Sequence, residues 1–122
     1  MAGHAPSKVI LAEKFPAFSD QWSPKIVARF NHNEVRLCKL EGDFHWHHHA
    51  DTDEMFLVVD GQLEIDFRDR TETLGAGEMI IVPRGTEHRP RAPHGEAKVF
   101  VMDAADTPNT GNEATATKAV DL

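Results

Sequence analysis

The chain has a single cysteine and no long apolar segment, whereas proteins of oxidising compartments are often rich in cysteine and membrane-spanning proteins need long apolar segments. Its single cysteine, Cys38, excludes an internal disulfide, which fits a reducing compartment. No segment approaches the roughly 20 apolar residues of a membrane-spanning helix, and no N-terminal run is long and apolar enough for a signal peptide. We therefore expect a cytoplasmic protein.

Basic residues and tyrosine are also scarce. The 13 lysines and arginines are outnumbered by 20 aspartates and glutamates, which gives a net charge of −7. Binding to a phosphate backbone or an anionic membrane needs a basic face, so we expect no nucleic-acid partner and no membrane partner. The absence of tyrosine excludes a mechanism that uses a tyrosyl acid or base.

The pattern along the chain predicts one all-β domain with an extension at each end. Residues 25–103 contain about nine or ten short apolar or alternating runs, separated by turn signals every few residues. This spacing is typical of an antiparallel sandwich or barrel. We expect residues 1–24 to form an N-terminal arm and residues 104–122, rich in Ala, Thr, Asp and Asn, to form a C-terminal tail.

The N-terminal arm carries more large apolar residues than a free arm needs. Residues 11–15 predict a short helix ended by Pro16, and the alternative is an edge strand over residues 8–11. Trp22 is expected to anchor the turn that follows. The arm is therefore expected to pack against something, such as a second subunit.

Residues 42–61, GDFHWHHHADTDEMFLVVDG, concentrate the side chains that carry chemistry. They hold four of the eight histidines within five positions. His47 and His49 are two residues apart, and in an extended strand such residues project from the same face. Glu54 follows a polar turn at the start of the next strand. Two imidazoles and a carboxylate brought together in this way predict a non-haem transition-metal site.

Residues 77–88, GEMIIVPRGTEH, supply one more candidate ligand. They read as a glycine turn, a short apolar strand and a Pro/Gly turn, and they end on His88.

Together the two stretches resemble the paired motifs of the cupin superfamily. The first motif, G-x5-H-x-H-x3/4-E-x6-G, is matched with four rather than five residues after its first glycine, by Gly42, His47, His49, Glu54 and Gly61. The second motif, G-x5-P-x-G-x2-H-x3-N, is matched at full spacing by Gly77, Pro83, Gly85 and His88, with Ala92 in place of the asparagine.

The resemblance covers roughly residues 35–103, and it implies an antiparallel jelly-roll (double-stranded β-helix) barrel. It also implies a divalent metal ion held by His47, His49, Glu54 and His88. Three nitrogens and one carboxylate suit Mn, Fe, Co, Ni, Cu or Zn, and four protein ligands leave one or two positions open. The activities implied are those of sugar isomerases and epimerases, dioxygenases, decarboxylases and lyases. Small bacterial single-domain cupins are often labelled mannose-6-phosphate-isomerase-like.

The histidines and acidic residues of the first stretch also have an interpretation without a functional role. The histidine cluster could be a solvated strand that binds metal only adventitiously. If the strand alternates, His45 shares the ligand face, either as an acid/base or as a residue that supports the ligands, whereas Trp46 and His48 point away. Asp51 and Asp53 could orient the histidines or be solvated turn residues.

The remaining polar residues near the motifs also leave two alternatives open. Arg84, Arg89 and Arg91 could clamp an anionic ligand or be surface charges. Cys38 could be a core residue or line the pocket. A set of apolar residues is expected in the core: Phe44, Met55, Phe56, Leu57, Met79, Ile81, Phe100 and Met102.

Two functions of different class fit this sequence. One is a metal-dependent enzyme, an isomerase or dioxygenase, of a small organic molecule such as a sugar or small acid. The other is a non-catalytic small-molecule or metal-binding module. A homodimer is expected, because one face of the apolar run at residues 55–59 needs cover outside the barrel.

Overall fold

The computed structural model of the protein describes residues 6–122, so the first five residues of the predicted N-terminal arm lie outside the described range. A short helix and a 3-10 turn come first, α1 (Leu11–Lys14) and η1 (Phe15–Ala17). The strands follow: β1 (Lys25–Phe30), β2 (Asn33–Asp43), β3 (Glu54–Asp60), β4 (Leu63–Asp66), β5 (Thr71–Leu74), β6 (Met79–Val82), β7 (Arg89–Ala104) and β8 (Val120–Asp121).

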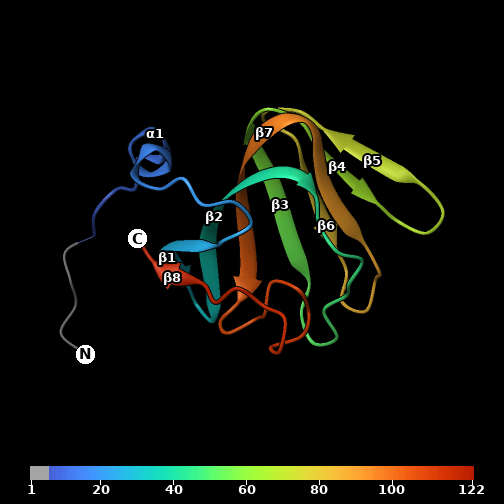
Figure 1. The fold of residues 1–122 in the computed structure, drawn as a ribbon. Helices are drawn as coiled ribbons and strands as arrows, with labels where there is room; N and C mark the ends of the chain where they lie inside the picture. Colours follow the sequence, from blue (N-terminus) through green and yellow to red (C-terminus); the bar gives the residue numbers. More distant parts are fainter. Residues whose placement is uncertain (1–5) are drawn as a thin grey trace.

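The strands form a jelly-roll barrel, which confirms the predicted all-β class. Hydrogen-bonded neighbours follow the order β5-β4-β7-β2-β1-β8, and β3 pairs with both β6 and β7. All of these pairs are antiparallel except β1 with the short β8. The long strand β7 joins the two walls, because its first half pairs with β4 and its second half with β3 (Figure 1).

The barrel core follows from the two-residue period of the strands. Phe56 and Val58 of β3 point inward and are buried, whereas the alternating residues Met55, Leu57 and Val59 are half-buried on the outer face. The inner cluster has twelve buried members: Cys38, Leu40, Phe56, Val58, Leu63, Ile65, Leu74, Val82, Ala92, Ala97, Val99 and Val101. Each fully buried Val, Leu, Ile or Phe contributes roughly 1.5–3 kcal/mol relative to an exposed one.

Two of the predicted core residues, Met79 and Ile81, are instead on the surface. Their exposed fractions are 53% and 49%. β6 pairs with β3 in the register Met55↔Ile81 and Leu57↔Met79, which turns these side chains to the outer face while Val82 points inward. The other predicted core residues divide, with Phe56 buried and Phe44, Met55, Leu57, Phe100 and Met102 half-buried.

The N-terminal arm packs on its own barrel. Of the two alternatives, the helix forms, as α1. Phe15 and Phe18 are buried against Leu37 of β2, in a second apolar cluster on the outer face of the sheet. The apolar residues of the arm are therefore covered in part by this chain itself, without a second subunit.

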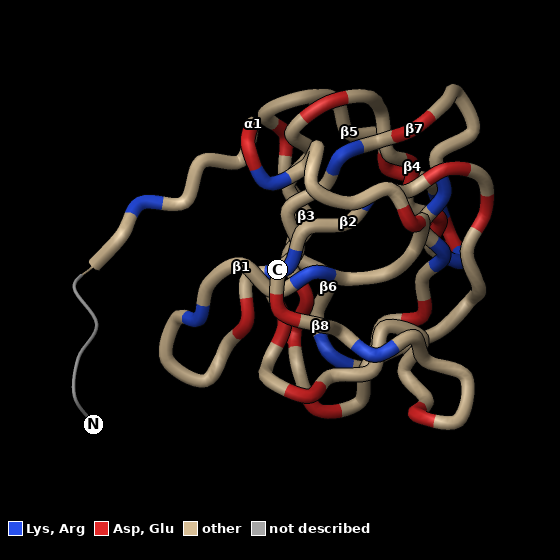
Figure 2. Tube along the Cα trace, turned by 60° about the vertical axis from the view of Figure 1, so that its left-hand side comes forward, with Lys and Arg blue, Asp and Glu red and all other residues tan. Residues whose placement is uncertain are grey.

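Charged residues of both signs are interspersed along the chain, as Figure 2 shows. Across residues 6–122, no helix has the length and apolar character that crossing a bilayer would need.

Candidate metal centre

An isolated β-bridge between His47 of the first motif and His88 of the second brings the predicted ligands together. His47 and His88 exchange hydrogen bonds, with N–H to O=C distances of 3.0 Å and 2.9 Å. The N–H of Gly85 donates to the carbonyl of His49 at 2.8 Å. The extended strand expected around His47 and His49 does not form, and of these two residues only His47 takes part in a β-bridge.

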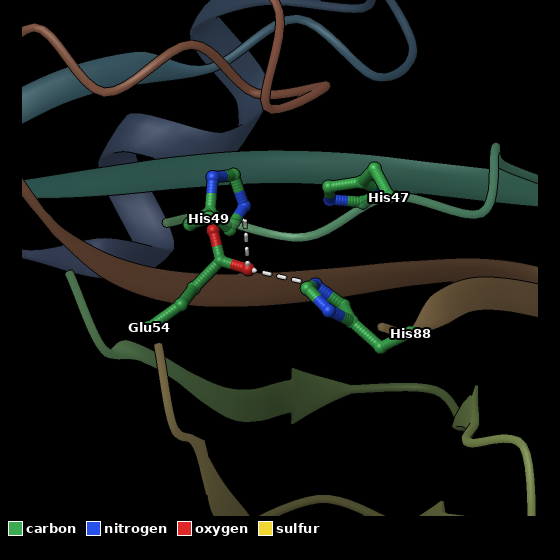
Figure 3. A group of neighbouring side chains, drawn as sticks. All are labelled: His47, His49, Glu54 and His88. Atoms are coloured by element: carbon green, nitrogen blue, oxygen red, sulfur yellow. Dashed lines mark hydrogen bonds and ion pairs between the residues drawn. The ribbon is translucent and has the colours of Figure 1, made fainter. Parts of the chain in front are cut away.

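The four predicted ligands form one buried cluster (Figure 3). One candidate ligand atom from each of His47, His49, Glu54 and His88 lies within 4.8 Å of all the others. Oε1 of Glu54 is 3.4 Å from Nε2 of His49 and 3.3 Å from Nε2 of His88. Their exposed fractions are at most 9%, so the group is shielded from bulk solvent.

Backbone carbonyls orient two of the imidazoles. Nδ1 of His47 donates to the carbonyl of His45, and Nδ1 of His88 donates to the carbonyl of Thr86, both at 2.9 Å. These bonds leave the Nε2 lone pairs of both rings available to a metal. Both ring nitrogens of His49 are buried without a hydrogen-bond partner among residues 6–122. A buried imidazole is rarely left unpaired, and a metal ion would satisfy it.

The charge states of the cluster also suit a cation. Burial lowers the pKa of His47 to about 4, so its ring is neutral at pH 7. Burial alone would raise the pKa of Glu54, but the close imidazoles of His49 and His88 hold it below its usual range. Neutral imidazole and ionised carboxylate are the ligand forms that bind a divalent metal.

Asp103 is an acidic residue of the site that the sequence motifs do not include. It is 2% exposed, and its Oδ1 has no hydrogen-bond partner within the described chain. Burial, together with the negative charge of Glu54, raises its pKa well above the usual value, so Asp103 carries the proton of the pair. The guanidinium of Arg36 lies 3.7 Å away and is held by Glu34 at 2.7 Å.

A small cavity of about 40 Å³ adjoins the cluster. His47, Glu54 and Asp103 line it together with apolar residues of the barrel wall, and Trp22 and Asn109 also contribute. It has room for roughly one or two water molecules. Cys38 lines this cavity and is also buried in the inner core, so both of its predicted roles apply.

The polar residues around the motifs act at the surface and do not contact the imidazoles. Asp53 accepts hydrogen bonds from the N–H and Nε of Arg84, which ties the two motif loops together. Arg89 and Arg91 both donate to Asp66. The arginines are thus engaged by acidic groups of the chain.

His45 and His48 are both exposed. The His45 ring packs against Phe44, with centroids 4.9 Å apart, and does not line the small cavity. A role for His45 as acid or base stays a prediction.

The model of the family described as Cupin domain matches residues 35–103. The chain belongs to the cupin superfamily. The cupin match ends just after Asp103 and leaves residues 104–122 outside it.

Relatives of this cupin agree with the assignment. It is 43% identical over 67 residues to the uncharacterized protein YdbB of Bacillus subtilis, a match that covers 54% of this chain and 59% of that protein. A crystal structure of a cupin-2 domain containing protein from Shewanella frigidimarina is 45% identical, with a TM-score of 0.77, and the match covers 79% of this chain and 93% of that one. Protein NMB1881 from Neisseria meningitidis is 30% identical, with a TM-score of 0.73 and coverage of 81% and 100%.

Proposed function

We propose that this cupin binds one divalent transition metal through His47, His49, Glu54 and His88 and acts on a small organic molecule such as a sugar or small acid. The observation that carries the proposal is the buried group of four ligand atoms within 4.8 Å, in which the imidazole of His49 has no hydrogen-bond partner among the described residues. The donor set suits Mn, Fe, Co, Ni, Cu or Zn.

The chemistry would be divided between the metal and the protein. When bound, such an ion polarises a carbonyl or hydroxyl as a Lewis acid or supports O₂ chemistry. The carbonyls of His45 and Thr86 fix two imidazoles in the ligating tautomer. Asp103 holds a proton on its carboxyl group beside Glu54, and the small volume of the cavity limits the water beside the ligands to roughly one or two molecules.

Isomerase and dioxygenase chemistry make different demands on these residues. Isomerisation moves a proton between adjacent carbons and needs an acid/base group, for which Asp103 and His45 are the candidates. A dioxygenase needs only open coordination positions and a dry pocket. Asp103 supports the isomerase better than His45 does, because only Asp103 lines the cavity.

A non-catalytic binding or sensing module is the second candidate. The cavity of about 40 Å³ supports it, because a sugar does not fit beside the ligands in this conformation.

The test is to load the protein with iron, manganese, nickel or zinc and to assay O₂ uptake and aldose–ketose interconversion. The matched control is His88→Ala treated in the same way. Turnover that requires His88 supports the enzyme. A full equivalent of metal without turnover in either assay supports the binding module.

We also propose that the protein is a homodimer. Support comes from the outer face of β3, β6 and β7, where Met79 and Ile81 are exposed beside the half-buried Met55, Leu57 and Met102. A second copy that presents the same apolar face would cover it. Light scattering after size exclusion should give twice 13.6 kDa for the wild type and 13.6 kDa for Ile81→Glu. A wild-type mass of 13.6 kDa would contradict the dimer.

A cytoplasmic location is proposed as well. The buried, unpaired thiol of Cys38 supports it, because reducing compartments favour free cysteines. Cell fractionation that finds the protein outside the cytoplasm would overturn this placement.

A further inference from the structure

The C-terminal strap, defined as residues 105–117, lies across the barrel beside the metal cavity. In Figure 1 it is the orange-to-red loop between β7 and β8. Its residue Asn109 lines the cavity together with His47, Glu54 and Trp22. The strap lies outside residues 35–103, the part of the chain that matches the cupin family model.

Hydrogen bonds, rather than buried apolar side chains, hold the strap in place. The side chain of Asn109 donates to the carbonyl of Trp22 at 3.2 Å and accepts from the N–H of Thr117 at 2.9 Å. Arg36 donates to the carbonyl of Thr107 at 2.9 Å. Within the strap only Thr110 is buried. A segment with few buried apolar contacts opens at a lower free energy than the barrel it covers.

At Gly111 the backbone of the strap packs closely against the backbone of His48. A Cβ built on Gly111 would overlap the carbonyl oxygen of His48, which lies between two of the proposed ligands. Gly111 also has φ +76, where a side chain is strained. Only glycine therefore lets the strap seat fully on residues 47–49.

We propose that this strap, through Asn109, sets the size of the molecule that reaches the proposed metal site. With the strap seated, the cavity of about 40 Å³ admits water or a diatomic molecule and excludes a sugar or organic acid. When the strap lifts, the wall formed by Asn109 is removed. This inference rests on the proposed function, because it concerns access to the proposed metal site, but its test does not use the metal.

Cys38 makes the inference measurable, because the only cysteine of the chain lines this cavity. The rate of its modification reports how often the cavity opens to a reagent of a given size. Methyl methanethiosulfonate serves as the small probe and 5,5′-dithiobis(2-nitrobenzoate) as the large one.

Gly111→Ala is the strap variant, and Gly77→Ala is its matched control. Gly77 has φ +81, close to that of Gly111, but a Cβ there would meet nothing within 4 Å. Asn109→Ala is a second strap variant, which removes two hydrogen bonds without touching backbone geometry. Each rate is measured at several urea concentrations below the unfolding transition, so that local opening is distinguished from global unfolding by its smaller urea dependence.

The large probe should react roughly 5- to 30-fold faster with both strap variants than with the wild type, a factor that corresponds to about 1–2 kcal/mol. Gly111→Ala favours opening because its Cβ overlaps the carbonyl oxygen of His48, and Asn109→Ala favours it because two hydrogen bonds are lost. The small probe should change less, and Gly77→Ala should match the wild type. Equal rates for the large probe in the wild type, Gly111→Ala and Asn109→Ala would overturn the inference. So would reaction that follows global unfolding in every variant.

Discussion

At the scale of single residues, His47 gives the metal-free protein a pH-dependent stability. Its pKa is lowered to about 4 from the ordinary 6.5, so between these values the unfolded chain binds a proton that the folded chain does not. The stability that neutral His47 contributes is present above pH 6.5 and is lost as the pH falls towards 4.

The expected loss is roughly 2 kcal/mol between pH 7.5 and pH 5. Urea unfolding of chelator-treated wild type and His47→Gln at both pH values measures it. The wild type should lose this much more than the variant does. Equal losses would contradict the assigned protonation state of His47.

Replacing a carboxyl group by an amide should weaken metal binding at Glu54 but not at its neighbour Asp103. Glu54 is ionised and Asp103 is protonated, because the pKa of Glu54 is lowered and that of Asp103 is raised. Glu54→Gln should therefore weaken metal binding by well over tenfold, whereas Asp103→Asn should keep the metal stoichiometry. Competition titrations with a chromogenic chelator compare the two variants. A larger loss in Asp103→Asn would contradict the assignment of charge.

The candidate ligands could be predicted from the sequence because motif spacing encodes them. Fixed spacings from the turn glycines of the two motifs place His47, His49, Glu54 and His88, and the structure brings these four side chains together. Asp103 belongs to no motif. Its signal is the two-residue period of β7, which places it on the inner face after Val99 and Val101.

At the scale of elements, the arm should contribute to stability through η1. Phe15 is 3% exposed and packs against Leu37, whereas Phe30 at the end of β1 is 61% exposed. Phe15→Ala should cost roughly 3–5 kcal/mol and Phe30→Ala within about 0.5 kcal/mol. Chemical denaturation measures both variants. Similar costs would show that the arm does not pack on the sheet in solution.

The positions of the strands could be predicted better than which face of each strand points to the core. Alternation in the sequence marks β4 and the strand around Val35 to Leu40, but it does not say which side of β6 faces the core. That choice depends on the pairing of β6 with β3, a contact between distant segments. Pro93 and Gly95 are residues typical of turns, yet the strand β7 continues through both of them.

At the scale of the whole molecule, the barrel fold places three regions that are distant in the sequence next to one another at the proposed metal site. The first motif supplies His47 and His49, β3 begins with Glu54, and the second motif ends with His88. The C-terminal strap then adds Asn109 to the cavity wall. The strap position could not be predicted, because its sequence has no periodicity and its contacts are polar and long-range.

The central claim is that these four side chains hold a metal ion. The direct measurement is elemental analysis of untagged protein purified without chelator, beside His47→Ala, His88→Ala and the control His48→Ala, whose histidine is exposed. We predict about one equivalent of a transition metal in the wild type and in His48→Ala, and its loss from the other two variants. A wild type that is free of metal and cannot be loaded would contradict the account, as would equal metal content in all four proteins.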